Sequence, residues 1–228
     1  MNWTWFPEDI SKSGHVVDQL FYLALSLTTV AFVAVLGILF YFLIRYRSGA
    51  NPKAHYTKGD SRPALVLTLT LAILVFILID LNLAFHDDEA WSVLWKKPGA
   101  GQALEILVEP EQFAWNATYA GADGVIGTAD DVKTLNDVHI PVNRPIVIDL
   151  RSKDVIHSFF LPNFRIKQDA VPGIVTHLTF EAVKTGNYEI ACAEHCGLGH
   201  YRMRGALTVH TPEEFDAWLS QNAPKENA

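Results

Sequence analysis

Two long apolar runs near the N-terminus constrain this chain more than any other feature. From Leu20 to Ile44, 25 consecutive residues carry no charge. As a helix rising about 1.5 Å per residue they extend roughly 37 Å, which exceeds the roughly 30 Å of hydrocarbon in a bilayer. The second run, Ala64 to Phe85, contains Asp80 and Asn82, which must lie near a membrane face or against protein. We therefore predict two membrane-spanning helices, at about 20–44 and 64–85.

The first run could instead be a secretory signal. A signal has an apolar core of about 7–15 residues that follows a basic segment and precedes a small-residue cleavage site. Here the preceding segment is acidic, with Glu8, Asp9 and Asp18 against Lys12. We favour a retained span, and removal of a short N-terminal piece stays open.

The residues between the two runs are basic and set the orientation. This segment holds a single acid, Asp60, against five basic residues, Arg45, Arg47, Lys53, Lys58 and Arg62. A short basic loop stays on the cytoplasmic side. Both termini, and everything after the second span, are then predicted on the periplasmic side of a bacterial plasma membrane or on the corresponding outer side of a mitochondrial inner membrane.

Beyond the hairpin, the sequence changes to the pattern of a soluble β-domain. Short runs of alternating polarity, separated by Gly, Pro and Asn turns, predict an antiparallel β-sandwich or barrel. The runs are 103–109, 113–119, 145–152, 175–182, 187–191 and 204–210. Thr211, Pro212 and Glu214 then form a helix-start signature, and Phe215, Trp218 and Leu219 would face the core. We expect a transmembrane hairpin over 1–90 and an outer domain with a short C-terminal helix over 91–228.

The outer part is acidic. Residues 86–228 carry 12 Lys or Arg against 20 Asp or Glu, so their formal charge is −8. This balance disfavours nucleic acid and favours a basic partner.

One stretch of twelve residues carries the chemistry. It reads Cys192-Ala-Glu194-His-Cys196-Gly-Leu-Gly-His200-Tyr-Arg-Met203 and contains both cysteines of the chain. Thiolates, imidazole and thioether favour copper over calcium or magnesium. A disulfide is the ordinary alternative outside the cytoplasm, and structural zinc is another, but neither explains His and Met at this spacing. A single-copper site needs only one Cys, so the second thiolate favours two coppers sharing bridging sulfurs.

Each copper of such a pair needs its own imidazole, and His157, in Asp154-Val-Ile-His157-Ser, is the candidate for the second one. Together with Lys167-x-Asp169-Ala-x-Pro172-Gly173 and the cysteine motif, this segment resembles cytochrome c oxidase subunit II over the full chain. The resemblance implies a cupredoxin-like outer domain with a binuclear CuA centre. In it Cys192 and Cys196 bridge the coppers, His157 and His200 bind one each, and Met203 and the backbone carbonyl of Glu194 are weak ligands.

The resemblance also implies the function. The family accepts electrons from cytochrome c, or another haem c donor, and passes them to haem in subunit I, where oxygen reduction is coupled to proton translocation. Subunit I, other oxidase subunits and membrane lipid are the implied partners, and the Glu194 carboxylate resembles a ligand of magnesium at the subunit I boundary. Two alternatives are the CuA domain of another respiratory reductase and a non-redox subunit II of the quinol-oxidase type.

The sequence departs from the family pattern in three places. Phe113 replaces the tryptophan that accepts the electron from cytochrome c, so Phe113, Trp115 and Asp154 mark only a candidate region for electron transfer from the donor. Ala64 stands where the second span often has a proton-path glutamate. The insertion at 122–131 has the oxygen-rich composition of a calcium loop, but a glycine-rich hairpin turn is the favoured interpretation.

Overall fold

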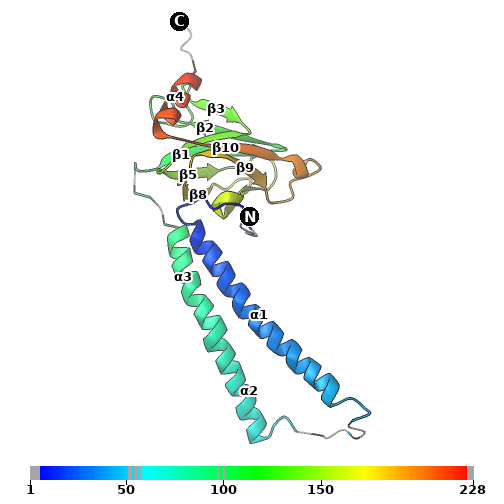
Figure 1. Cartoon of the computed structure of the whole chain (residues 1–228). Coiled ribbons are helices and arrows are strands. Elements are labelled where there is room, and N and C mark those ends of the chain that lie inside the picture. Colours follow the sequence, from blue (N-terminus) through cyan, green and yellow to red (C-terminus); the bar gives the residue numbers. More distant parts are fainter. Residues whose placement is uncertain are drawn as a thin grey trace. The chain divides into compact units, whose positions relative to one another are not determined.

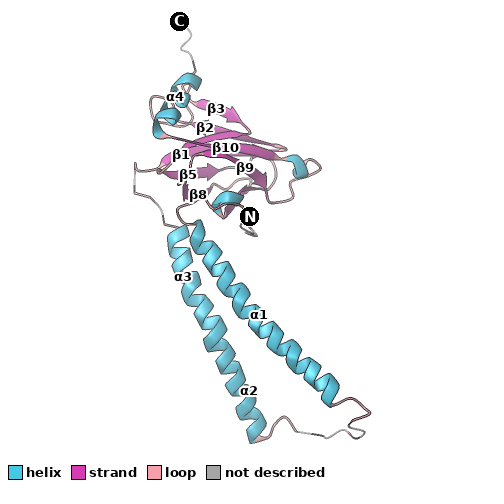
Figure 2. Cartoon of the chain, viewed as in Figure 1, coloured by secondary structure: helices cyan, strands magenta, loops and turns pink. Residues whose placement is uncertain are grey.

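The computed structural model describes residues 6–50, 53, 56, 58–96, 98–99 and 101–224. The chain divides into two compact units: Asp18–Ser92 forms one, and Met1–Val17 with Val93–Ala228 forms the other. The first unit is helical, and the second is built mainly of strands (Figure 1, Figure 2).

The helical unit contains two long helices. The first is α1, Gly14–Arg45, and the second runs through α2 (Arg62–Val75), the π-helical segment η1 (Phe76–Leu81) and α3 (Asn82–Leu94). Both are long and apolar enough to cross a membrane, and the most apolar window of each is 0% buried within the protein. Apolar surface of this extent needs lipid or protein to cover it. The predicted spans at 20–44 and 64–85 lie inside these helices, while residues 51, 52, 54, 55 and 57 of the basic connection lie outside the described residues.

The second unit is a sandwich of two five-stranded sheets, as the cupredoxin-like prediction required. One sheet has the order β3-β2-β1-β5-β8 and the other β4-β10-β9-β6-β7. The strands are β1 (Leu104–Glu111), β2 (Ala114–Tyr119), β3 (Val132–Leu135), β4 (Asp137–Pro141), β5 (Pro145–Leu150), β6 (His157–Leu161), β7 (Ile166–Ala170), β8 (Thr176–Glu181), β9 (Gly186–Cys192) and β10 (Arg204–His210). Short 3-10 turns, η2 (Pro162–Phe164) and η3 (His200–Arg202), follow β6 and precede β10.

The sheets are mixed rather than purely antiparallel, which corrects the expected strand arrangement. β1 pairs in parallel with β5, and β10 pairs in parallel with β4, whereas the remaining described pairs are antiparallel. Parallel neighbours require a crossover connection, and here each crossover includes strands of both sheets: β2, β3 and β4 lie between β1 and β5, and β5 to β9 lie between β4 and β10. Alternation of polarity along one strand carries no information about the direction of its neighbour.

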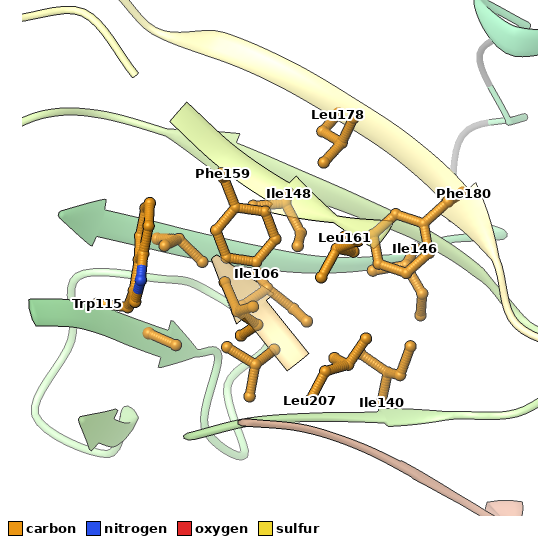
Figure 3. Packing of buried hydrophobic residues seen from close by; sticks show 14 of the residues in the cluster. Ile106, Trp115, Ile140, Ile146, Ile148, Phe159, Leu161, Leu178, Phe180 and Leu207 are labelled. Atoms are coloured by element: carbon orange, nitrogen blue, oxygen red, sulfur yellow. The ribbon is translucent and has the colours of Figure 1, made fainter. Parts of the chain in front are cut away.

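The core lies between the sheets and is apolar. Figure 3 shows Trp115, Phe159, Ile148 and Leu161 packed side by side among other aliphatic residues. Trp115 and Phe159 are 0% exposed and meet edge to face, with ring centroids 5.2 Å apart. At about 25 cal/mol per Å² of buried apolar area, these large rings stabilise the end of the sandwich where the cysteine motif emerges.

The predicted C-terminal helix is confirmed. It is α4, Pro212–Asn222, and its capping box is complete: the Glu214 N–H donates to Thr211 Oγ1 over 3.3 Å, and the Thr211 N–H donates to Glu214 Oε2 over 3.0 Å. Phe215 is buried, while Trp218 and Leu219 pack against the core from its edge. A residue ahead of α1 joins the same core, because Ile10 is 0% exposed and its N–H donates to the carbonyl of Asn163.

The insertion forms the connection between β2 and β3. Its acids accept hydrogen bonds from the loop itself: Asp123 from the N–H of Val125, Asp130 from the Thr128 hydroxyl, and Asp131 from the N–H of Gly127. Gly124 and Gly127 adopt φ of 72° and 105°, a region that glycine enters without steric cost. These features are those of a glycine-rich connecting loop.

Candidate metal centre

The cysteine motif folds as a loop between two adjacent strands. Cys192 is the last residue of β9, and Met203 directly precedes β10. The loop is closed where the Cys192 N–H donates to the carbonyl of Met203 over 3.2 Å. We call residues 193–203 the ligand loop.

His157 reaches the ligand loop through strand pairing. It is the first residue of β6, which runs antiparallel to β9 with Phe159 opposite Cys192. The register therefore places His157 level with the first residues of the loop, and the N–H of Ala193 donates to the carbonyl of Ser158 over 3.0 Å. Sequence alternation did not predict β6, because its burial pattern is continuous rather than alternating.

The candidate ligands converge on one another. The nitrogen and sulfur donors of His157, Cys192 and Cys196 all lie within 4.8 Å of each other. The sulfur of Cys196 lies 3.7 Å from His200 Nδ1 and 3.6 Å from Met203 Sδ. The sulfur of Cys192 lies 3.2 Å from the Glu194 carbonyl oxygen. All six predicted ligands thus meet within one small volume.

The two sulfurs are not covalently joined. Their separation is 3.8 Å, and both cysteines are free, whereas a disulfide bond measures about 2.05 Å. The arrangement presents two thiol groups side by side, the donors that a bridged metal pair requires.

The orientation of His157 fits a metal ligand. Its Nε2 lies 2.8 Å from Asp154 Oδ1, and its Nδ1 is buried without a hydrogen-bond partner. Burial raises the pKa of Asp154, but bonds from the His157 ring and from the N–H groups of Gln112 and Val155 outweigh it and lower that pKa. An ionised carboxylate only accepts, so Nε2 carries the hydrogen and the Nδ1 lone pair is left for a ligand. A carboxylate behind a histidine is a common support in metal sites.

The two thiols differ in acidity. Burial raises the pKa of Cys192, but the neighbouring His157 ring and hydrogen bonds from the backbone of Ser158 and Glu194 outweigh it and lower that pKa to about 6. Burial and the neighbouring Cys192 thiolate raise the pKa of Cys196 to about 11. One thiolate therefore forms readily and opposes the second, a repulsion that a cation between them would relieve.

The other predicted residues lie around this group. Phe113 is half-buried, Trp115 is 0% exposed with its ring centroid 6.2 Å from that of His157, and Asp154 touches His157 directly. Glu194 is exposed, and its carbonyl oxygen approaches the sulfur of Cys192. Gln112, which the sequence did not single out as a site residue, donates through Nε2 to the carbonyl of Cys196 over 2.6 Å.

Several known proteins are similar to this chain. The family model described as cytochrome c oxidase subunit II, periplasmic domain, matches residues 120–209. Cytochrome c oxidase subunit 2 of Thermostichus vulcanus is 31% identical over 95% of this chain and 78% of the relative. The alternative cytochrome c oxidase subunit 2 of Bradyrhizobium diazoefficiens is 28% identical over 96% and 84%. A crystal structure of the periplasmic domain of the Bradyrhizobium japonicum subunit II is 29% identical over 55% of this chain and 95% of that one, with a TM-score of 0.48. This chain belongs to the cytochrome c oxidase subunit 2 family.

Proposed function

We propose that this chain is the copper-bearing, electron-accepting subunit of a haem–copper cytochrome c oxidase. Its family makes it a component of an oxidoreductase complex. The observation that carries the proposal is the convergence of His157, Cys192 and Cys196 within 4.8 Å, in the part of the chain that the structure describes. Several thiolate and imidazole ligand atoms this close together favour copper.

Each of the six candidate ligands has a proposed role. Cys192 and Cys196 would be shared between two coppers, His157 and His200 would each hold one, and Met203 and the carbonyl of Glu194 would be weak ligands. When bound, this pair supplies a one-electron redox centre. The protein holds the donors in a rigid frame, since β6, β9 and β10 are neighbours in one sheet. Rigid placement keeps reorganisation small when the charge changes. Magnesium at the Glu194 carboxylate stays a prediction.

The electron donor is proposed to be a c-type cytochrome, and the acceptor to be haem in subunit I, where oxygen is reduced. The formal charge of −8 over residues 86–228 would attract a basic donor. Next to His200, Tyr201 is 75% exposed, and Leu198 is 95% exposed, so the ligand loop offers the donor apolar surface. Trp115, with no exposed surface, cannot touch a donor, which leaves Phe113 and Asp154 as the predicted contact residues.

The proposed setting is a membrane with two spans and both termini outside. The membrane hairpin lies within 1–90 and the copper domain spans 91–228, whose core also takes in Ile10 from ahead of α1. Lipid surrounds α1 and the helix from Arg62 to Leu94. The basic residues between the helices support a cytoplasmic connection. Other oxidase subunits are the expected neighbours of the hairpin.

Two other functions use the same fold. A quinol-oxidase-type subunit lacks copper ligands, whereas all six ligand positions are present here and adjacent. The CuA domain of another reductase differs by its attached catalytic domain. Copurification of the intact complex, with a metal and haem spectrum, distinguishes such a reductase from a cytochrome c oxidase.

The test is copper stoichiometry of the full chain in detergent, loaded under reducing conditions. We expect two coppers per chain and, after the loaded chain is oxidised by one electron per copper pair, the spectrum of a delocalised mixed-valence pair. Cys196→Ser removes the second bridging sulfur and abolishes that spectrum. His195→Ala is the control, because His195 lies in the same loop, is exposed, and is not a predicted ligand. One copper, or zinc, per wild-type chain would refute the proposal.

A further inference from the structure

The turn between β1 and β2 lies against the ligand loop. It consists of Gln112 and Phe113, which connect Glu111 of β1 to Ala114 of β2. This turn belongs to the opposite sheet from β6, β9 and β10. Its contact with the ligand loop is therefore a contact across the end of the sandwich.

Gln112 connects the two segments that carry the ligands. Its side-chain Nε2 donates to the carbonyl of Cys196 over 2.6 Å. Its backbone N–H donates to Asp154 Oδ2 over 2.7 Å, and Asp154 Oδ1 lies 2.8 Å from His157 Nε2. A continuous chain of hydrogen bonds therefore runs from the carbonyl of one bridging cysteine to the ring of a ligand histidine.

Phe113 occupies space that two glycines of the ligand loop leave open. A Cβ added at Gly199 would come within 2.5 Å of Phe113 Cδ2, and one added at Gly197 within 2.6 Å of Gln112 Nε2 and 3.4 Å of the Phe113 ring. The backbone of Gly199, with φ −91° and ψ 6°, lies in the bridge region, which residues other than glycine also adopt. The absence of a side chain at 199 is thus explained by the ring.

We propose that Gln112 is a positioning residue for the copper ligands, and that Phe113 seats the ligand loop by packing on Gly199. The inference rests on the proposed copper-binding function. It gives Phe113 a structural role at the position where the family pattern has a redox-active tryptophan. Gln112 fixes the Cys196 carbonyl and Asp154 together, and Asp154 orients the His157 ring.

The first experiment removes the side-chain donor of Gln112 in the full chain. Gln112→Leu removes the side-chain amide and keeps the backbone N–H. Without copper, amide hydrogen exchange over 194–202 should accelerate roughly 2- to 10-fold, as expected for one lost hydrogen bond. With copper, release to a chelator should accelerate about 10-fold. Gln221→Leu, an exposed glutamine on α4, should change neither rate. Unchanged exchange over 194–202 in Gln112→Leu would overturn the proposal.

The second experiment tests the ring against the glycine. Gly199→Ala should lower the Tm of the full chain because its Cβ meets the Phe113 ring. In Phe113→Ala/Gly199→Ala the Tm loss should be smaller than the sum of the two single losses, since the clash is gone. The control pair, Phe113→Ala with Gly205→Ala, should be additive, because Gly205 faces Asn136, Ile190 and Trp115 instead. Additivity at 199 would refute the seating role.

These readouts separate the inference from the proposed function. Hydrogen exchange and Tm are measured on chain without copper, so they report on the turn whether or not two coppers bind. A wild-type chain that fails to bind two coppers contradicts the proposed function alone. A normal copper pair with unchanged exchange in Gln112→Leu contradicts the inference alone.

Discussion

We predict that Asp154 determines which nitrogen of His157 carries the hydrogen, and Asp154→Asn tests this directly. The carboxylate accepts from His157 Nε2 at 2.8 Å and from the Gln112 N–H at 2.7 Å. An amide has only one acceptor oxygen. If that oxygen keeps the Gln112 N–H, the amide NH₂ faces Nε2, and the imidazole hydrogen moves to Nδ1. The nitrogen that should bind copper is then blocked.

The expected loss of copper affinity equals the free energy needed to move the hydrogen from Nδ1 back to Nε2 before copper can bind. Disruption of a hydrogen bond behind a metal ligand lowers metal affinity about 10- to 100-fold, which corresponds to roughly 1.4–2.7 kcal/mol at 1.36 kcal/mol per factor of ten. We expect Asp154→Asn to fall in this range while the Tm of the copper-free chain changes little, since Asp154 lies at the surface with its side chain 32% exposed.

Competition with a chelator of known copper affinity measures the effect. Asp149→Asn is the matched control: Asp149 Oδ1 lies 2.7 Å from His177 Nδ1 in an exposed pair on the other sheet. It should leave copper affinity unchanged. An Asp154→Asn chain that binds copper within twofold of wild type would show that this carboxylate does not orient the ligand.

The remaining predictions concern stability, topology and the donor. The His210 ring lies 2.7 Å from His139, and burial and that neighbour lower the pKa of His210. The unfolded chain therefore binds more protons below about pH 6.5, and stability falls as the pH drops through this region. Thermal unfolding from pH 8 to 5.5 should show it, with a shallower dependence in His210→Asn. A cysteine placed at Ser48 should react with a membrane-impermeant reagent in opened vesicles and not in intact cells; labelling of intact cells would reverse the topology. Reduction of the copper centre by its donor should slow as salt rises, because charges of opposite sign are screened beyond about 8 Å at physiological ionic strength; a rate independent of salt would indicate a tethered donor. Phe113→Leu should slow that reduction modestly and Phe113→Trp should be tolerated in stopped-flow measurements, whereas a collapse of the rate in Phe113→Leu at unchanged donor affinity would make the ring part of the electron path.

The sequence by itself determined the local features of this protein. Helix length follows directly from an uninterrupted apolar run, so both long helices could be located from composition. The capping box of Thr211 and Glu214 acts within one turn, and it specified the start of α4. The spacing of Cys192, Cys196, His200 and Met203 placed four potential metal ligands in or next to one loop, because so short a segment cannot separate them.

Tertiary structure decided what depends on strand order. The parallel partners of β1 and β10 and the strand nature of β6 come from packing between sheets, which no run of alternating residues encodes. The hydrogen bond from Gln112 to Cys196 joins residues 84 positions apart. The contact between Asp154 and His157 bears on the metal centre only because β6 pairs with β9 and so brings His157 to the cysteines. Nothing local in Gln112 distinguishes it from a surface glutamine. Its role exists because two sheets bring their ends together around the same four donors and His157.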